Sequence, residues 1–155
     1  MTAQQQIESW ILNFLSKPNS VFNNLPPCPY AKQAWLDGKV EVIETDAKHL
    51  EQQICKILET FPDDKDLVMF VLDPNEVSYE QLELISKQYK NEKFALLKDH
   101  PNECETVKDV VLNNGKYAII FVQRREELIR TRKELASTGY YDNFDPEYKQ
   151  EILKC

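Results

Sequence analysis

Glycine is scarce in this chain, with only three glycines among 155 residues. Loops that bind phosphate through backbone amides need closely spaced glycines, and no GxGxxG, GxxxxGKS or GxxxxGKT motif occurs. Basic residues are also few, since 19 Lys and Arg stand against 26 Asp and Glu and leave a net charge of −7. Because nucleic-acid binding needs clustered Lys and Arg, we expect no nucleic-acid partner.

Long apolar runs are missing as well. No stretch approaches the roughly 18 apolar residues of a membrane-spanning helix, so we expect no membrane partner. The opening residues, MTAQQQIESWILNFL, lack the basic and apolar regions of a secretory signal peptide. No CxxC metal or dithiol pair exists among the four cysteines, which are Cys28, Cys55, Cys104 and Cys155. These absences predict a cytoplasmic protein with reduced thiols and give no sign of a metal site.

The remaining composition is that of an ordinary globular protein, at 42% hydrophobic and 29% charged residues. A chain of this length predicts one domain, residues 1–155. We divide it into an N-terminal helix and Cys-Pro loop packed on the core (1–38), an α/β core (39–139) and an aromatic C-terminal tail (140–155).

Hydrophobic periodicity predicts the order of elements. Helical spacing occurs in residues 5–18, 46–61, 78–92 and 125–137, and a short helix follows Cys28. Strand-like runs occur in residues 39–45, 67–73, 93–99 and 116–123, with a β-hairpin expected over 94–122. This order is β-α-β, a helix, then β-β-α. It predicts an α+β fold, a ferredoxin-like sandwich of about four mixed strands with additional helices; an open α/β sheet is the competing arrangement.

The stretch LPPCPYAK, residues 25–32, is the most distinctive local pattern. Proline is favoured at the first helical position, so Pro29 suggests that Cys28 is the N-cap of a helix. The positive end of a helix lowers a thiol pKa, and Lys32 can add to this effect. The alternative is structural, with Cys28 capping the helix and packing under Tyr30 and Trp35.

The Cys-Pro-Tyr-Ala sequence resembles the Cys-Pro-Tyr-Cys site of glutaredoxins, but Ala31 replaces the second cysteine. The stretch more closely resembles the Leu-Cys-Pro-Phe-Ala motif of an uncharacterised family of small bacterial proteins, with Tyr30 at the Phe place and two extra prolines before Cys28. In that family the motif also follows an amphipathic helix. The resemblance directs attention to Cys28 but implies no particular reaction.

Other candidates lie outside this loop. His100, in a turn after a strand, is a possible general base, although a plain turn histidine is the simpler interpretation. Arg124 and Arg125 at a strand end can hold an anion, or can belong to intrahelical ion pairs. The aromatic residues Tyr140 and Tyr141, with Phe144, either close the core or form a recognition surface.

Two hypotheses of function follow. In the first, the protein is a thiol-dependent enzyme or redox protein with Cys28 as the nucleophile, assisted by His100 and Lys32. In the second, it is a non-catalytic module that binds a small molecule or a protein. Its binding surface is then the Pro-rich loop with Tyr30 and the Tyr140–Phe144 tail. The sequence does not indicate which cofactor, if any, the protein uses.

Overall fold

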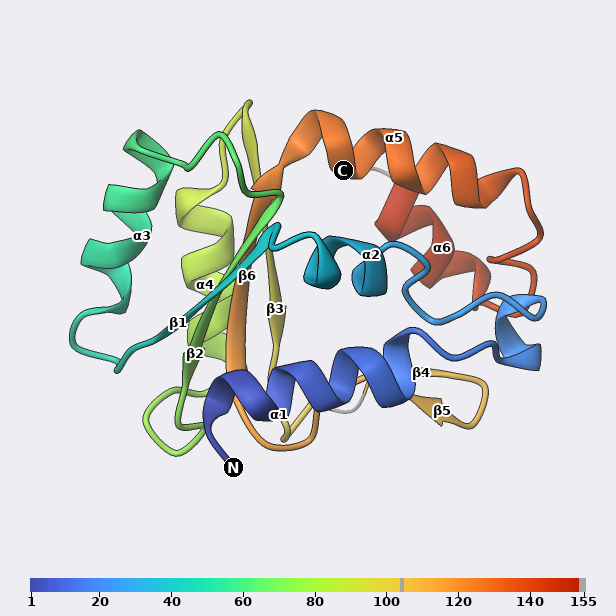
Figure 1. The fold of residues 1–155 in the computed structure, drawn as a ribbon, viewed down its shortest axis with the longest axis horizontal. Helices are drawn as coiled ribbons and strands as arrows, with labels where there is room; N and C mark the ends of the chain where they lie inside the picture. The colour runs from blue at the N-terminus through green and yellow to red at the C-terminus, as the bar shows by residue number, and fades with distance from the viewer. Residues whose placement is uncertain (104, 154–155) are drawn as a thin grey trace.

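Helices cover both faces of a four-stranded central sheet (Figure 1). The computed structural model describes residues 1–103 and 105–153. The elements, in order, are α1 (Ala3–Trp10), the π-helix η1 (Ile11–Leu15), the 3₁₀ turn η2 (Ser20–Phe22), α2 (Ala31–Leu36), β1 (Val40–Glu44), α3 (Leu50–Glu59), β2 (Leu67–Leu72), α4 (Tyr79–Tyr89), β3 (Phe94–Asp99), β4 (Thr106–Val107), β5 (Val110–Val111), β6 (Ala118–Arg124), α5 (Arg125–Ala136) and α6 (Pro146–Leu153). The expected α+β class is confirmed.

The strand order in the sheet is β1-β2-β6-β3. β1 and β2 are parallel, whereas β6 runs antiparallel to both β2 and β3. The pairing of β3 with β6 confirms the expected hairpin, and the short β4–β5 hairpin is inserted in the connection between them. The ferredoxin-like arrangement is not confirmed, because the main sheet follows the order β-α-β-α-β-β-α rather than β-α-β-β-α-β.

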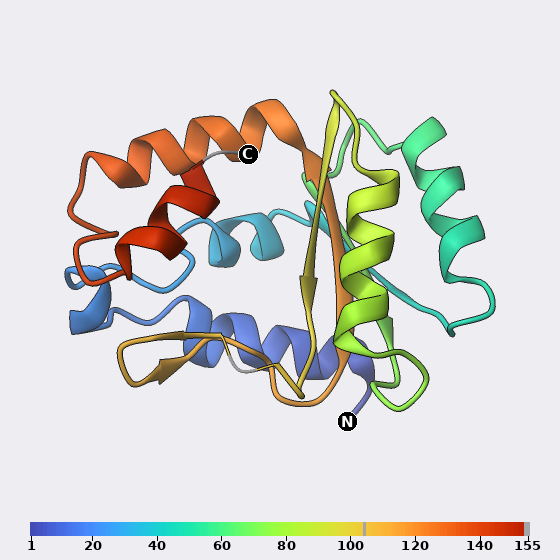
Figure 2. The ribbon, with the colours of Figure 1, turned by 180° about the vertical axis from the view of Figure 1, so that it is seen from behind.

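Alternate residues of the strands divide between two hydrophobic cores, because side chains in a strand alternate between faces. One core joins the sheet to α3 and α4 through Leu50, Ile54, Val68, Phe70, Leu82, Ile120 and Val122. The opposite core joins it to α1 and the start of η1 through Ala3, Ile7, Ile11, Met69, Val71 and Ile119. The front and back views show α1 and α2 on one side of the sheet and α3 and α4 on the other (Figures 1 and 2).

A third, aromatic core lies away from the sheet. It is formed by Phe22, Val107, Tyr140, Tyr141 and Phe144, all of them buried. The ring of Tyr140 lies 5.1 Å from Phe22 and 4.9 Å from Tyr141, measured between centroids. The expected aromatic tail therefore closes a core, and it does so against the N-terminal loop rather than against the sheet.

None of the helices in the described part of the chain combines the length and the apolar character that crossing a membrane requires.

Candidate functional site

The loop that carries Cys28 is fastened at two neighbouring backbone positions. The Cys28 N–H donates to the carbonyl of Leu15, the last residue of η1, at 2.9 Å. The carbonyl of the preceding Pro27 accepts a hydrogen bond from the Tyr140 hydroxyl. The N-terminal helix and the C-terminal segment together therefore set the position of the thiol.

The local environment of Cys28 differs from the expectation. The N-cap of α2 is Tyr30, and the helix has only six residues. Burial raises the pKa of the Cys28 thiol, and the backbone N–H groups of Tyr30 and Ala31 oppose this shift only in part. The predicted lowering of the pKa is therefore wrong, because desolvation outweighs the amides. Lys32 is exposed on α2, and its ammonium is not among the groups that shift this pKa.

The structure brings Cys28 together with the three tyrosines named as binding candidates. Burial raises the pKa values of Tyr140 and Tyr141. A negative charge on Cys28 would raise the pKa values of Tyr30, Tyr140 and Tyr141 further, because all three lie near it. Cys28 itself is half-buried, whereas Tyr140 and Tyr141 are only 7% and 5% exposed. They do not form an open recognition surface.

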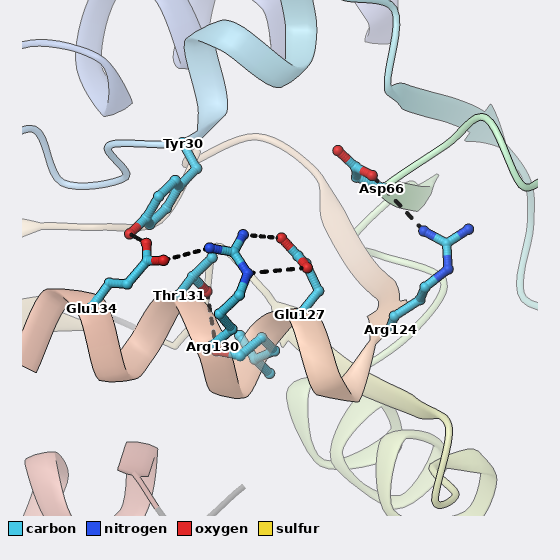
Figure 3. A network of polar contacts seen from close by, with 8 residues as sticks. Tyr30, Asp66, Arg124, Glu127, Arg130, Thr131 and Glu134 are labelled. Atoms are coloured by element: carbon cyan, nitrogen blue, oxygen red, sulfur yellow. Dashed lines mark hydrogen bonds and ion pairs between the residues drawn. The ribbon is translucent and has the colours of Figure 1, made fainter.

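Tyr30 also reaches α5. Its hydroxyl donates to Glu134 at 2.9 Å, and Glu134 in turn pairs with Arg130, as Figure 3 shows. Burial and this carboxylate raise the pKa of Tyr30 to about 12. The hydroxyl is therefore protonated at neutral pH.

His100 lies elsewhere and is fully engaged. Its side chain is 1% exposed, and Nε2 lies 2.7 Å from the carbonyl oxygen of Val77. Nδ1 accepts a hydrogen bond from the backbone N–H of Asn102 at 3.1 Å. Both ring nitrogens therefore bond to the backbone, which fixes a neutral tautomer with the proton on Nε2. The imidazole supports the turn after β3, and its hydrogen bonds go to backbone groups rather than to Cys28.

Arg124 and Arg125 do not converge on a common ligand. The Arg124 guanidinium donates to the carbonyls of Lys65 at 2.7 Å and Pro62 at 3.0 Å. Figure 3 shows Arg124 directed toward Asp66, apart from the Arg130 network. The Arg125 Nε donates to the carbonyl of Asn91 at 2.9 Å. Arg124 ties the loop before β2 to β6, and Arg125 ties the turn before β3 to the start of α5, so both have structural roles.

The sequence analysis did not identify a groove at the carboxyl ends of β1 and β2. We call this the strand-end groove. It has a volume of about 390 Å³ and is lined by Glu44, Thr45, Val71, Leu72, Asp73, Pro74, Asn75, Glu76, Lys116 and Tyr117. A signal was present in the sequence, because a β-α-β unit places the carboxyl ends of its two strands side by side, where α/β sheets commonly bind ligands.

The strand-end groove is predominantly negative. Glu44, Asp73 and Glu76 are exposed there, against the single ammonium of Lys116. Asp73 accepts a hydrogen bond from the Asn75 N–H at 2.8 Å, which leaves its second oxygen available. Among residues 1–103 and 105–153, no ion pair involves Glu44 or Asp73. Within the described part of the chain, Glu44 and Asp73 thus offer carboxylates that are engaged in no ion pair.

Within the described residues, no group of three His, Cys, Asp or Glu side chains is arranged to hold a metal ion. Compared with models of protein families, with curated proteins and with solved structures, the chain gave no match.

Proposed function

We propose that this protein is a non-catalytic binding module that holds a cationic group of its ligand in the strand-end groove. The observation that carries the proposal is the groove itself, formed where two parallel strands end side by side. The groove is open to solvent and has a volume of about 390 Å³, so a ligand held there keeps part of its surface in water.

The charges of the groove indicate the chemistry of the ligand. Carboxylates such as Glu44 and Asp73 accept strong charge-assisted hydrogen bonds from an ammonium or a guanidinium group. Because these carboxylates are exposed, their attraction for a cation weakens as salt is added. We therefore expect modest, salt-dependent binding of an organic cation, either a free amine or a basic side chain of a peptide.

This proposal has more support than a thiol-dependent enzyme. A nucleophilic cysteine needs a thiolate, and burial favours the protonated form of Cys28. A general base needs a free ring nitrogen, and both nitrogens of His100 already bond to the backbone.

Titration of the ¹⁵N-labelled protein, followed by NMR, tests the binding proposal. Spermidine represents the free amine, an arginine-rich tetrapeptide represents the peptide, and citrate is the anionic control. We expect one of the two cations to shift the amides of Thr45, Asn75 and Tyr117, and the shifts to weaken in high salt. If neither cation shifts these amides, or if shifts scatter over the whole acidic surface, the proposal fails.

A matched pair of variants sharpens this test. Glu44→Gln with Asp73→Asn removes two charges from the groove, whereas Glu59→Gln with Asp63→Asn removes two exposed charges near the opposite end of β2. We expect the first variant to lose several-fold in cation affinity and the second to keep it. Equal losses would show that only the overall charge attracts the cation.

A thiol-dependent function is the second candidate, and one observation favours it. The backbone N–H groups of Tyr30 and Ala31 both act to stabilise a Cys28 thiolate. Alkylation by iodoacetamide, measured against pH on the native protein, tests this candidate, with exposed Cys55 as the internal reference. Fast reaction of Cys28 at neutral pH would support a catalytic thiol, whereas reaction slower than that of Cys55 would refute it.

A further inference from the structure

A buried carboxylate at the end of β3 is enclosed by two consecutive asparagines. Asp99 is only 7% exposed. Its Oδ1 accepts a hydrogen bond from the Asn113 amide, and its Oδ2 accepts from the Asn114 backbone N–H at 3.1 Å and from the Asn114 Nδ2 at 2.6 Å. These donors satisfy a charge that burial would otherwise make costly.

The side chain of Asn114 also shapes the turn that leads into β6. Its Oδ1 accepts hydrogen bonds from the backbone N–H groups of Lys116 at 3.0 Å and Tyr117 at 2.8 Å. Its Nδ2 donates to the Tyr117 carbonyl at 3.0 Å, in addition to Asp99. Asn114 therefore positions the two residues that form one wall of the strand-end groove.

We propose that Asn114 is a modification site, at which spontaneous deamidation converts the amide to a carboxylate. The backbone nitrogen of Gly115 attacks Cγ of Asn114, a C–N bond forms, and ammonia leaves with the proton that the nitrogen loses. Water then opens the resulting succinimide to aspartate or isoaspartate. The step needs an unhindered nitrogen, and Gly115 provides one because it has no side chain and, its chain neighbours aside, no heavy atom lies within 4 Å of where a Cβ would stand.

The fold controls when this reaction can occur. Cyclisation requires the Asn114 amide to rotate away from its partners, and four hydrogen bonds hold that amide in place. The reaction therefore proceeds from a locally opened form of residues 112–117, whose population is set by the free energy of opening. The folded protein is protected, and the opened protein is not.

Deamidation is also expected to destabilise the turn in which it occurs. A carboxylate at position 114 places an oxygen where the Nδ2 now donates to Asp99, so two like charges face each other in a largely buried site. The turn then holds Lys116 and Tyr117 less firmly. The inference does not depend on ligand binding in the groove, because it rests on the asparagine cluster alone.

Peptide mass spectrometry of the protein incubated at pH 8 and 37 °C tests the inference. Deamidation adds about 1 Da to the peptide that contains Asn114. We expect its rate to be at least about tenfold lower in the folded protein than in urea, since the reaction needs the opened form. Asp99→Asn should raise the rate in the folded protein, and Gly115→Ala should lower the rate in urea. Equal rates in both states, or no gain in urea, would overturn the proposal.

The stability of Asn114→Asp gives a second readout. Urea unfolding should show this variant to be less stable than the parent at pH 7, with the difference shrinking as the pH falls and the added carboxylate becomes protonated. If the difference in stability does not change with pH, the idea that two carboxylates face each other at positions 99 and 114 is contradicted.

Discussion

Replacing Gly139 by alanine is expected to cost far more stability than the same change at either of the other two glycines. All three glycines have positive φ angles, at 68° for Gly38, 79° for Gly115 and 81° for Gly139. A Cβ added at Gly38 or Gly115 meets no atom within 4 Å. At Gly139 it would lie 2.7 Å from Nδ2 of Asn23 and 3.0 Å from Oδ2 of Asp142. All three substitutions therefore strain the backbone, but only the alanine at position 139 also collides with neighbouring side chains.

The magnitude follows from these geometries. A left-handed alanine costs about 1 kcal/mol or somewhat more, and the loss of glycine flexibility in the unfolded chain returns about 0.4–1 kcal/mol. We therefore expect about 0–1 kcal/mol at Gly38 and Gly115. At Gly139, Asn23 must also move, which breaks its hydrogen bond to the Thr138 carbonyl at 2.7 Å and costs about 1 kcal/mol. Overpacking adds about 1–3 kcal/mol, so we expect about 2–5 kcal/mol in total.

Urea unfolding of the three variants, read by circular dichroism, measures these differences. Asn23→Gly provides a further control, because glycine tolerates the positive φ of 57° at that position and removes the obstructing side chain. In the Asn23→Gly background, the excess cost of Gly139→Ala over Gly38→Ala should shrink, because only the contact with Oδ2 of Asp142 at 3.0 Å remains. If all three glycine variants lose the same stability in the parent protein, the close approach of the N-terminal loop to the turn after α5 is refuted.

Three further predictions concern the aromatic core and the buried acids. Tyr140→Phe removes the donor to the Pro27 carbonyl and should lower the free energy of unfolding by about 1–3 kcal/mol; urea unfolding should show a smaller loss for Tyr141→Phe. Glu105→Gln should stabilise the protein at pH 7, because burial and a nearby carboxylate raise the pKa of Glu105; the gain should disappear near pH 4, and an unchanged gain there would contradict the cause. The raised pKa of Cys28 contributes stability that is complete below the unfolded thiol pKa of about 8.5 and is lost as the pH rises. The melting temperature of Cys28→Ala should therefore fall less steeply between about pH 8 and 9.5 than that of the parent protein. Equal slopes would refute a raised thiol pKa.

Patterns among neighbouring residues were enough to predict much of the secondary structure. The strand-like run at 67–73 is continuously apolar up to Leu72, which is typical of a strand buried on both faces, and β2 is nearly all buried. Ser78 and Gln81 stand three residues apart, the spacing of a capping box, and both of its hydrogen bonds are present. These features depend on neighbouring residues alone. The ferredoxin-like arrangement, by contrast, required knowing which strands pair, and that depends on contacts between distant segments.

The candidate site shows the same division. The sequence by itself determined that Cys28 lies between prolines at the approach to a helix, that the charge balance is acidic, and that Asn114-Gly115 forms a turn. Only the tertiary structure decided that Tyr140, which lies 112 positions away from Cys28 in the chain, bonds to the Pro27 carbonyl beside it, and that burial rather than the helix terminus sets the direction of the Cys28 pKa shift. Local patterns fix what a residue can do, whereas desolvation and convergence of charges arise only when remote segments pack together.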